Sequence, residues 1–210
     1  MTMRSLKLLP HAILLAAGAA WAQPQPSPRP AALCATADQA KQVVEYYKTA
    51  PGMLPPNAAR ALKLPEAVVV SGLPKDQVAV VSGAEFIKIW DTLTAWPDAL
   101  ALIMKGGHVF EITGKIKPGE ASARSNFYNI AYGGGLGGHL RPDLVSTIAV
   151  FAIPGKEGAV MRGVQFYDGS GEAGFGVFVP GGEGGKPSPE IVAAFEKTLA
   201  AAKSLRPACG

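Results

Sequence analysis

The spacing of hydrophobic residues follows a helical period at both ends of the chain and an alternating period between them. Thr36 and Gln39 have the spacing of a capping box, and Val43 and Tyr47 fall on one side of the helix that follows. We expect this helix to end before the proline at 51, and the Pro- and Ala-rich stretch as far as residue 65 to form short helices and turns.

Two further helices are predicted downstream. Ser82 and Glu85 form a second capping-box pair, and the apolar residues after them have core-facing helical spacing: Phe86, Ile89, Trp90 and Leu93. Near the C-terminus, Ser188 and Pro189 have the residue types of a helix start. The last helix would direct Ile191, Phe195 and Leu199 to the core.

Between these helices the period changes to two, which is typical of strands. The predicted strands are residues 77–81, 100–104, 108–117, 126–132, 146–153, 160–168 and 173–179. Short connections favour antiparallel pairing of successive strands. The order of helices, a run of strands and a last helix therefore predicts an α+β fold.

The first residues have the pattern of an export signal. Arg4 and Lys7 precede an apolar run, and Ala20-Trp21-Ala22 matches a small-x-small cleavage site. We expect residues 1–22 to be a signal peptide, 23–33 a proline-rich linker and 34–210 a single domain. An uncleaved anchor is the alternative. The predicted protein is exported and periplasmic, with no membrane segment after cleavage.

Net charge and cysteine content narrow the classes further. The formal charge of +4 falls to +2 when Arg4 and Lys7 leave with the predicted signal peptide, which is too small for a nucleic-acid footprint with its clustered basic stripe. Cys34 and Cys209 lie near the two ends of the mature chain, and in an oxidising compartment such a pair predicts a disulfide. Two free thiols are the alternative, because the sequence cannot show that the cysteines meet.

The candidate chemistry is concentrated in residues 126–141, where an aromatic strand runs into a glycine-rich stretch. His139 and Arg141 follow Gly137 and Gly138, so a flat ligand could approach the backbone beside an imidazole and a guanidinium. Imidazole binds iron and a guanidinium pairs with carboxylates. A turn histidine bonded to a backbone carbonyl is the alternative for His139.

Three more residues are weaker candidates. Tyr128 and Tyr132 are four apart on a predicted strand and would share one face, where a phenolate could bind ferric iron. His108 shares a strand face with Phe110 and would more often be a core residue.

The glycines at 133, 135 and 138 match a dinucleotide fingerprint only formally, since no helix-forming stretch follows them directly. Other enzyme and zinc motifs are missing from the sequence.

The middle of the chain resembles the HutX/ChuX family of haem-utilisation carrier proteins, which are related to half of a HemS-type haem-trafficking protein. The matching segments are LKLPEAVVV (62–70), FEITGKI (110–116), NFYNI (126–130), GLGGHLR (135–141), VQFYD (164–168) and FGVFV (175–179). The resemblance implies an α+β fold with a curved antiparallel sheet and a homodimer that binds haem b without a covalent link.

The resemblance also implies site residues. His139 falls on the family's histidine and becomes the best candidate for the iron ligand, with haem contacts from Arg141 and the neighbouring glycines. A second family histidine falls near Met104, and another is replaced by Ser125, so Met104, His108, Tyr128 or Tyr132 could supply the other ligand.

The expected function is haem binding and trafficking, with donor and acceptor proteins that the sequence does not identify. The family is cytosolic, whereas this chain has an export pattern. Two alternatives stay open: an enzyme on the same fold that degrades or reduces haem, and an interaction module that has lost the ligand.

Overall fold

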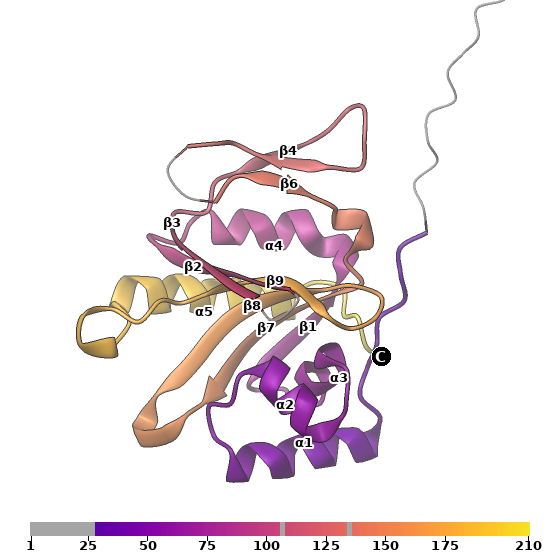
Figure 1. The fold of residues 1–210 in the computed structure, drawn as a ribbon, viewed down its shortest axis with the longest axis vertical. Helices are drawn as coiled ribbons and strands as arrows, with labels where there is room; N and C mark the ends of the chain where they lie inside the picture. Colours follow the sequence, from indigo (N-terminus) through magenta and orange to yellow (C-terminus); the bar gives the residue numbers. More distant parts are fainter. Residues whose placement is uncertain (1–27, 106–107, 134–135) are drawn as a thin grey trace, which may run out of the picture.

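The computed structural model describes residues 28–105, 108–133 and 136–210. Its elements stack in layers (Figure 1). Three helices lie on one face of a large sheet, two helices lie on the other face, and a small sheet lies beyond one of those two. The predicted signal peptide and the start of the predicted linker lie outside the described residues.

The N-terminal helices form as the sequence predicts. They are α1 (Ala37–Thr49), α2 (Pro55–Leu62) and α3 (Glu66–Ser71). The capping box of α1 is complete, because Thr36 Oγ1 accepts from the Gln39 amide at 3.3 Å and Gln39 Oε1 accepts from the Thr36 amide at 2.9 Å. Val43 of α1 is fully buried and packs with the apolar residues of α3.

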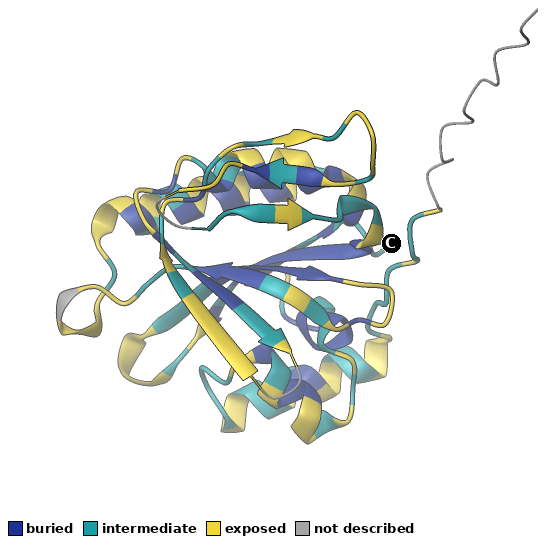
Figure 2. Ribbon diagram, turned by 45° about the horizontal axis from the view of Figure 1, so that its top comes forward, coloured by how far each residue is buried: buried dark blue, intermediate teal, exposed yellow. Residues whose placement is uncertain are grey.

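The large sheet contains six antiparallel strands in the order β1-β7-β8-β9-β2-β3. Its strands are β1 (Val78–Ser82), β2 (Ala99–Lys105), β3 (His108–Gly114), β7 (Thr147–Pro154), β8 (Val160–Tyr167) and β9 (Ala173–Phe178). The central strands are buried on both faces, whereas β3 at one edge is exposed for most of its length (Figure 2).

Helices α4 (Phe86–Leu93) and α5 (Pro189–Lys203) cover the face of the large sheet opposite α1–α3. Ser188 caps α5 as predicted, with its Oγ accepting from the Ile191 amide at 3.4 Å. Phe86 and Trp90 of α4 are buried and pack against Phe166 of β8. The predicted core-facing positions of both helices are confirmed.

The small sheet is the main departure from the single sheet that the sequence predicts. It consists of β4 (Gly119–Ala121), β5 (Tyr128–Ile130) and β6 (Gly138–Leu140), with β5 in the middle. Alternation over three residues is too short a signal to predict β4 and β6. The strands predicted at 108–117 and 126–132 are both shorter in the structure.

The predicted capping box at Ser82 is wrong in detail. Ser82 Oγ accepts from the Ala84 amide and begins a 3-10 turn, η1 (Gly83–Glu85), before α4. Glu85 instead forms ion pairs with Lys88 at 2.8 Å and Arg206 at 3.7 Å. The carboxylate of Glu85 therefore joins α4 to the C-terminal tail.

The two ends of the domain are joined by a disulfide between Cys34 and Cys209, as predicted from the sequence. The segment before Cys34 has no regular secondary structure but packs on the domain, with Arg29 donating to the carbonyls of Pro142 and Val145. The C-terminal tail forms a bridge to the edge of β1 at Pro207. Both ends are therefore fixed to the same side of the molecule.

Candidate functional site

The small sheet has two faces of different chemistry. Residues Tyr128 and Ile130 of β5 point inward, are 3% and 2% exposed, and pack over α4. Because side chains alternate along a strand, Asn129 between them points outward. The strand register places His139 of β6 opposite Asn129, so that these two residues share the outer face.

On the outer face, three side chains form a hydrogen-bonded chain. The Nδ1 atom of His139 lies 2.8 Å from Oδ1 of Asn129, and its Nε2 atom lies 3.0 Å from the hydroxyl of Tyr132. Tyr132 is 73% exposed. An imidazole and a phenol are thus held together at the surface, and a proton can pass between them.

Phe127 and Arg141 border this chain. The Phe127 ring centroid is 5.7 Å from that of His139, and the guanidinium carbon of Arg141 is 5.7 Å from the Phe127 ring centroid. Arg141 also forms a two-point ion pair with Asp143, at 2.8 Å and 2.6 Å. The hydrogen bonds from Arg141 hold the pKa of Asp143 below its usual value.

Two contacts fix the chain segment that carries Tyr132. Lys117 Nζ donates to the carbonyl of Tyr132 at 3.2 Å and also to that of Gly133. The Lys117 carbonyl in turn accepts from the indole of Trp90 at 2.9 Å. The buried helix α4 therefore positions the exposed Tyr132 through Lys117.

The glycines after Tyr132 permit a close backbone approach. A Cβ atom on Gly137 would lie 3.2 Å from Tyr132 Cα, and Gly138 has a φ of +148° that side chains rarely adopt. These glycines bring the chain past Tyr132 and back into β6 beside β5. Gly134 and Gly135 lie outside the described residues.

A hollow of about 500 Å³ lies beside the imidazole. Its lining includes Glu120, Asn129, Tyr132 and His139. This volume lies within the range of about 300–1,000 Å³ that is usual for small-molecule sites. A second hollow of about 480 Å³ lies along β1. Its lining includes Cys34 and Cys209, which are bonded to each other in the disulfide.

The structure separates the other candidate residues from His139. The prediction that Tyr128 and Tyr132 share a face is wrong, because β5 ends at Ile130 and Tyr132 lies beyond it. The Tyr128 hydroxyl is turned inward and accepts from the Gly119 amide at 3.1 Å, and burial raises its pKa. It is not available on the outer face.

Met104 and His108 lie in the large sheet, at the facing ends of β2 and β3, and not in the small sheet. His108 is exposed rather than part of an apolar core face. Ser125 lies in the β4–β5 connection, where its Oγ accepts from the Phe127 amide at 3.4 Å. Among the described residues, no group of three His, Cys, Asp or Glu side chains could hold a bare metal ion.

Sequence reasoning missed two residues, Asn129 and Lys117. Asn129 could have been found from the alternation of β5, since inward positions for Tyr128 and Ile130 leave it facing outward. Lys117 carried no such signal, because its contacts depend on how the loop after β5 folds back over β3–β4. The alternative of a turn histidine is also wrong, because His139 lies on a strand and bonds to side chains.

The sequence of the chain is similar to those of known proteins. A family model described as haem utilisation ChuX/HutX matches residues 79–198. The intracellular heme transport protein HutX of Vibrio cholerae is 28% identical over 158 residues, covering 74% of this chain and 80% of that protein.

The fold is also similar to solved structures. Two structures of ChuX, one titled a heme binding protein, have TM-scores of 0.68 at 24% and 23% identity and cover 77% of this chain. The matches cover 98% and 99% of the two ChuX chains. ChuS, titled an E. coli heme oxygenase, has a TM-score of 0.61 at 16% identity, over 81% of this chain and 50% of its own.

Proposed function

The chain belongs to the ChuX/HutX haem-utilisation family, and from this premise we propose that it binds haem b without a covalent link and carries it between other proteins. The observation that supports this most is the exposed pair of Tyr132 and His139 beside a hollow of about 500 Å³. Imidazole and phenolate are both haem-iron ligands in proteins. When bound, haem would supply a ferric or ferrous iron that takes a donor from this pair.

The residues around the pair fit a flat, partly apolar ligand. Phe127 is 39% exposed and Tyr132 is 73% exposed. Both rings therefore present apolar area to solvent that a flat ligand could cover. Arg141 and Lys117 are the nearby cations for carboxylate groups of the ligand. Arg141 would have to share its guanidinium with Asp143, since the two already pair.

His139 can donate to iron only through a nitrogen that is now hydrogen-bonded. Its Nε2 faces the Tyr132 hydroxyl and its Nδ1 faces Asn129. Nε2 would hold the iron if Tyr132 rotated aside, and the Tyr132 oxygen would hold it if His139 took the phenol proton. Both routes use the same pair, and both keep the ligand on the outer face of the small sheet.

The test is a titration of the purified protein with ferric haem. We expect a saturable Soret change at one haem per chain, weakened in His139→Ala and in Tyr132→Phe. Asn57→Ala on α2, which lies on the other side of the large sheet, serves as a matched control. A wild-type protein that leaves stoichiometric haem in its free spectrum would contradict the proposal.

Transport rather than chemistry is the proposed role. After addition of an electron donor, the haem complex should keep its porphyrin spectrum through repeated reduction and reoxidation. Progressive loss of the Soret band with release of iron would instead support haem degradation.

A second copy of the chain docks along β3 in this proposal. Strand β3 is an open edge of the large sheet, and its Val109 and Phe110 are 57% and 59% exposed. Long apolar edges of this kind favour pairing with another strand. Sedimentation should give a dimer for the wild type and a monomer for Phe110→Lys, and a wild-type monomer at micromolar concentration would contradict this arrangement.

The proposed location is outside the cytoplasm, in contrast to the relative titled intracellular. The N-terminal pattern and the Cys34–Cys209 disulfide support this location, because disulfides persist in oxidising compartments. Among the helices of the described residues, none has the length and apolarity needed to cross a bilayer. Mass spectrometry of the periplasmic fraction should find a mature N-terminus at Gln23, and an intact Met1 in the cytosol would contradict export.

A further inference from the structure

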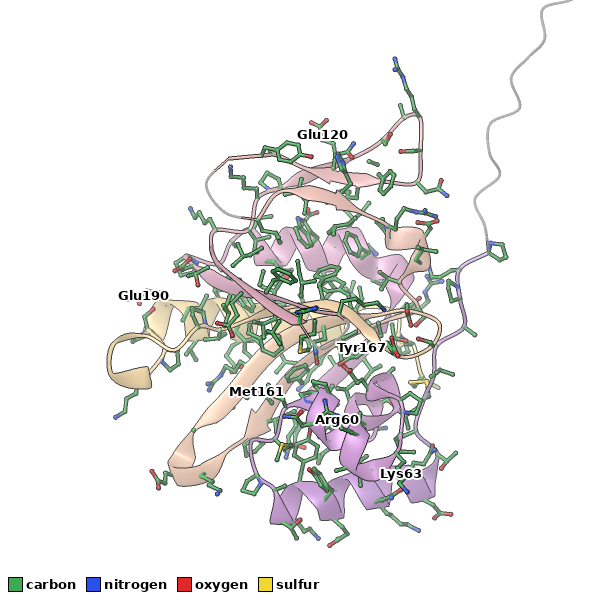
Figure 3. All side chains as sticks on the ribbon, viewed as in Figure 1. Arg60, Lys63, Glu120, Met161, Tyr167 and Glu190 are labelled. Atoms are coloured by element: carbon green, nitrogen blue, oxygen red, sulfur yellow. A yellow bond between two sulfur atoms is a disulfide. The ribbon has the colours of Figure 1, made fainter. Side chains whose placement is uncertain are left out.

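The outer face of the small sheet carries a row of polar side chains that extends beyond the tyrosine–histidine pair. The strand register places Glu120 of β4 opposite Asn129, and Asn129 opposite His139. Opposed side chains on one face of a sheet have Cβ atoms about 5 Å apart. Glu120 is directed away from α4, on the outer side of the small sheet (Figure 3). Asn129 therefore lies between a carboxylate and an imidazole.

This position decides which way the Asn129 amide is turned. An ionised carboxylate only accepts hydrogen bonds, so the NH₂ group of Asn129 is favoured on the side of Glu120. Its Oδ1 is then on the side of His139, in agreement with the 2.8 Å separation from Nδ1. An amide oxygen accepts and cannot donate, so Nδ1 of His139 must carry the proton.

The tautomer of His139 follows from this contact. With its proton on Nδ1, the neutral imidazole has a free electron pair on Nε2, which is the atom 3.0 Å from the Tyr132 hydroxyl. The phenol therefore donates to Nε2. The opposite tautomer would place an N–H against the phenol, so that Tyr132 would have to keep its own proton and turn it elsewhere.

We propose that Asn129 is a positioning residue for the haem site, which holds His139 in the Nδ1–H tautomer so that Nε2 can accept the Tyr132 proton. The inference rests on the proposed haem binding. Tyr132 would hold the iron of a bound haem, which would supply a Lewis acid at the phenol oxygen. The Tyr132 O–H bond would then break with its electron pair left on the oxygen, Nε2 of His139 would take the proton, and Asn129 Oδ1 would still accept from Nδ1–H.

The groups that face His139 are compatible with this transfer. Glu120 is the acidic residue of the row and lies one position beyond Asn129. Lys117 is held by the carbonyls of Tyr132 and Gly133 on the side of the phenol. Phe127 covers one side of the imidazole, and Arg141 lies across the Phe127 ring and pairs with Asp143.

The first test needs no haem. Long-range ¹H–¹⁵N NMR of the haem-free protein reports which ring nitrogen of His139 is protonated, with His139→Gln used to assign the signal. We expect the Nδ1–H form in the wild type and a mixture of tautomers in Asn129→Leu. A wild-type spectrum with the proton on Nε2 would overturn the proposal.

The second test compares haem release from Asn129 variants. Asn129→Leu removes the acceptor at similar size, and partner residues of this kind change ligand affinity by about 10-fold to 100-fold when lost. We therefore expect ferric haem to leave this variant at least about tenfold faster than the wild type. Asn129→Asp keeps an acceptor, so its release rate should lie within about threefold of the wild type.

Two results would overturn the assignment while leaving the proposed function intact. One is a wild-type release rate in Asn129→Leu, and the other is an equal loss in Asn129→Leu and Asn129→Asp. Asn57→Leu, the same change on α2, should match the wild type. If the wild-type protein binds no haem, the proposed function fails, while the NMR result still decides the tautomer.

Discussion

The two faces of the small sheet are built from alternate residues of the same strand yet differ in what holds them. Tyr128 and Ile130 are buried over Phe86 and Trp90, and the Tyr128 hydroxyl has a backbone partner. On the other face, Asn129, His139 and Tyr132 contact mainly one another at the surface. The inner face therefore contributes to stability, and the outer face is free to carry chemistry.

The largest effect should come from removing the support beneath the inner face. Trp90→Ala deletes a fully buried ring that packs against Tyr128, Phe166 and Phe175 and donates to the Lys117 carbonyl. Loss of such a side chain costs about 3–5 kcal/mol of unfolding free energy. Urea denaturation measures the loss, and a cost below about 1 kcal/mol would show that the small sheet does not depend on α4.

The next prediction concerns the outer face alone. Tyr132→Phe removes a hydroxyl that is exposed, so the unfolding free energy should change by less than about 0.5 kcal/mol. Haem release should accelerate by about 10-fold to 100-fold, because a donor or its proton partner is lost. Stopped-flow transfer of haem to an excess of a scavenging protein measures the rate, and an unchanged rate would remove Tyr132 from the site.

Tyr128→Phe is the matched change on the inner face. It leaves the partly buried Gly119 amide without its acceptor, which costs about 1–2 kcal/mol of unfolding free energy. Haem release should stay within about twofold of the wild type once the folded protein is compared. Tyr132→Phe should therefore change haem release but not stability, whereas Tyr128→Phe should change stability but not haem release. Equal effects of the two variants would contradict the difference between the two faces of the small sheet.

The carboxylate of Glu66 on α3 tests how burial affects a polar side chain away from the small sheet. Burial raises the pKa of Glu66 to about 7, with the charge of Glu172 adding to the shift. Because the folded pKa lies above the unfolded one, the folded state holds the proton more tightly and stability falls as the pH rises from about 4.5 to about 7.

Glu66→Gln should therefore stabilise the protein above pH 7 and have little effect at pH 4. The gain at high pH should be about 1–2 kcal/mol, since the partial exposure of Glu66 reduces the full effect of the shift. Thermal unfolding at several pH values measures it. A variant that is equally stabilised at both ends of the range would contradict this assignment.

The smallest effect is expected at Arg141. Its guanidinium already pairs with Asp143, so Arg141→Gln should raise the haem release rate by less than about threefold, although the sequence ranked this residue beside His139. The lowered pKa of Asp143 depends on this pair, and should return toward its usual value in the variant. Haem release and an NMR pH titration of Asp143 measure the two effects, and a tenfold faster release would show that Arg141 exchanges Asp143 for the ligand.

The sequence predicted the scaffold better than the site. Helical spacing in α1, α4 and α5 and alternation in the long strands reflect burial in a large core, where many residues repeat the same signal. Strands β4 and β6 have three residues each, and their pairing depends on the glycine-rich return of the chain rather than on periodicity. The sequence identified His139 and Tyr132 as candidate site residues but did not predict that they contact each other.

The contact between Tyr132 and His139 could not be predicted for a physical reason. Alternation assigns a residue to a face only while the chain stays in the strand, so it no longer places a residue that lies beyond the strand end. The sequence extended β5 to Tyr132 and so placed Tyr132 beside Tyr128, whereas the chain leaves the strand after Ile130 and turns Tyr132 outward. The outward direction of Asn129 follows from the alternation along β5, but its place opposite His139 depends on the β5–β6 register.

The disulfide at the ends of the domain has a mechanical consequence. Cys34 and Cys209 are separated by 175 positions, so almost every described residue lies inside one covalent ring. Tension applied to the segments outside the ring passes through the sulfur atoms and bypasses the sheets. A pore-threading unfoldase that pulls on either terminus would stall at this bond, and a chain that must pass a narrow channel can do so as a single strand only before the ring closes.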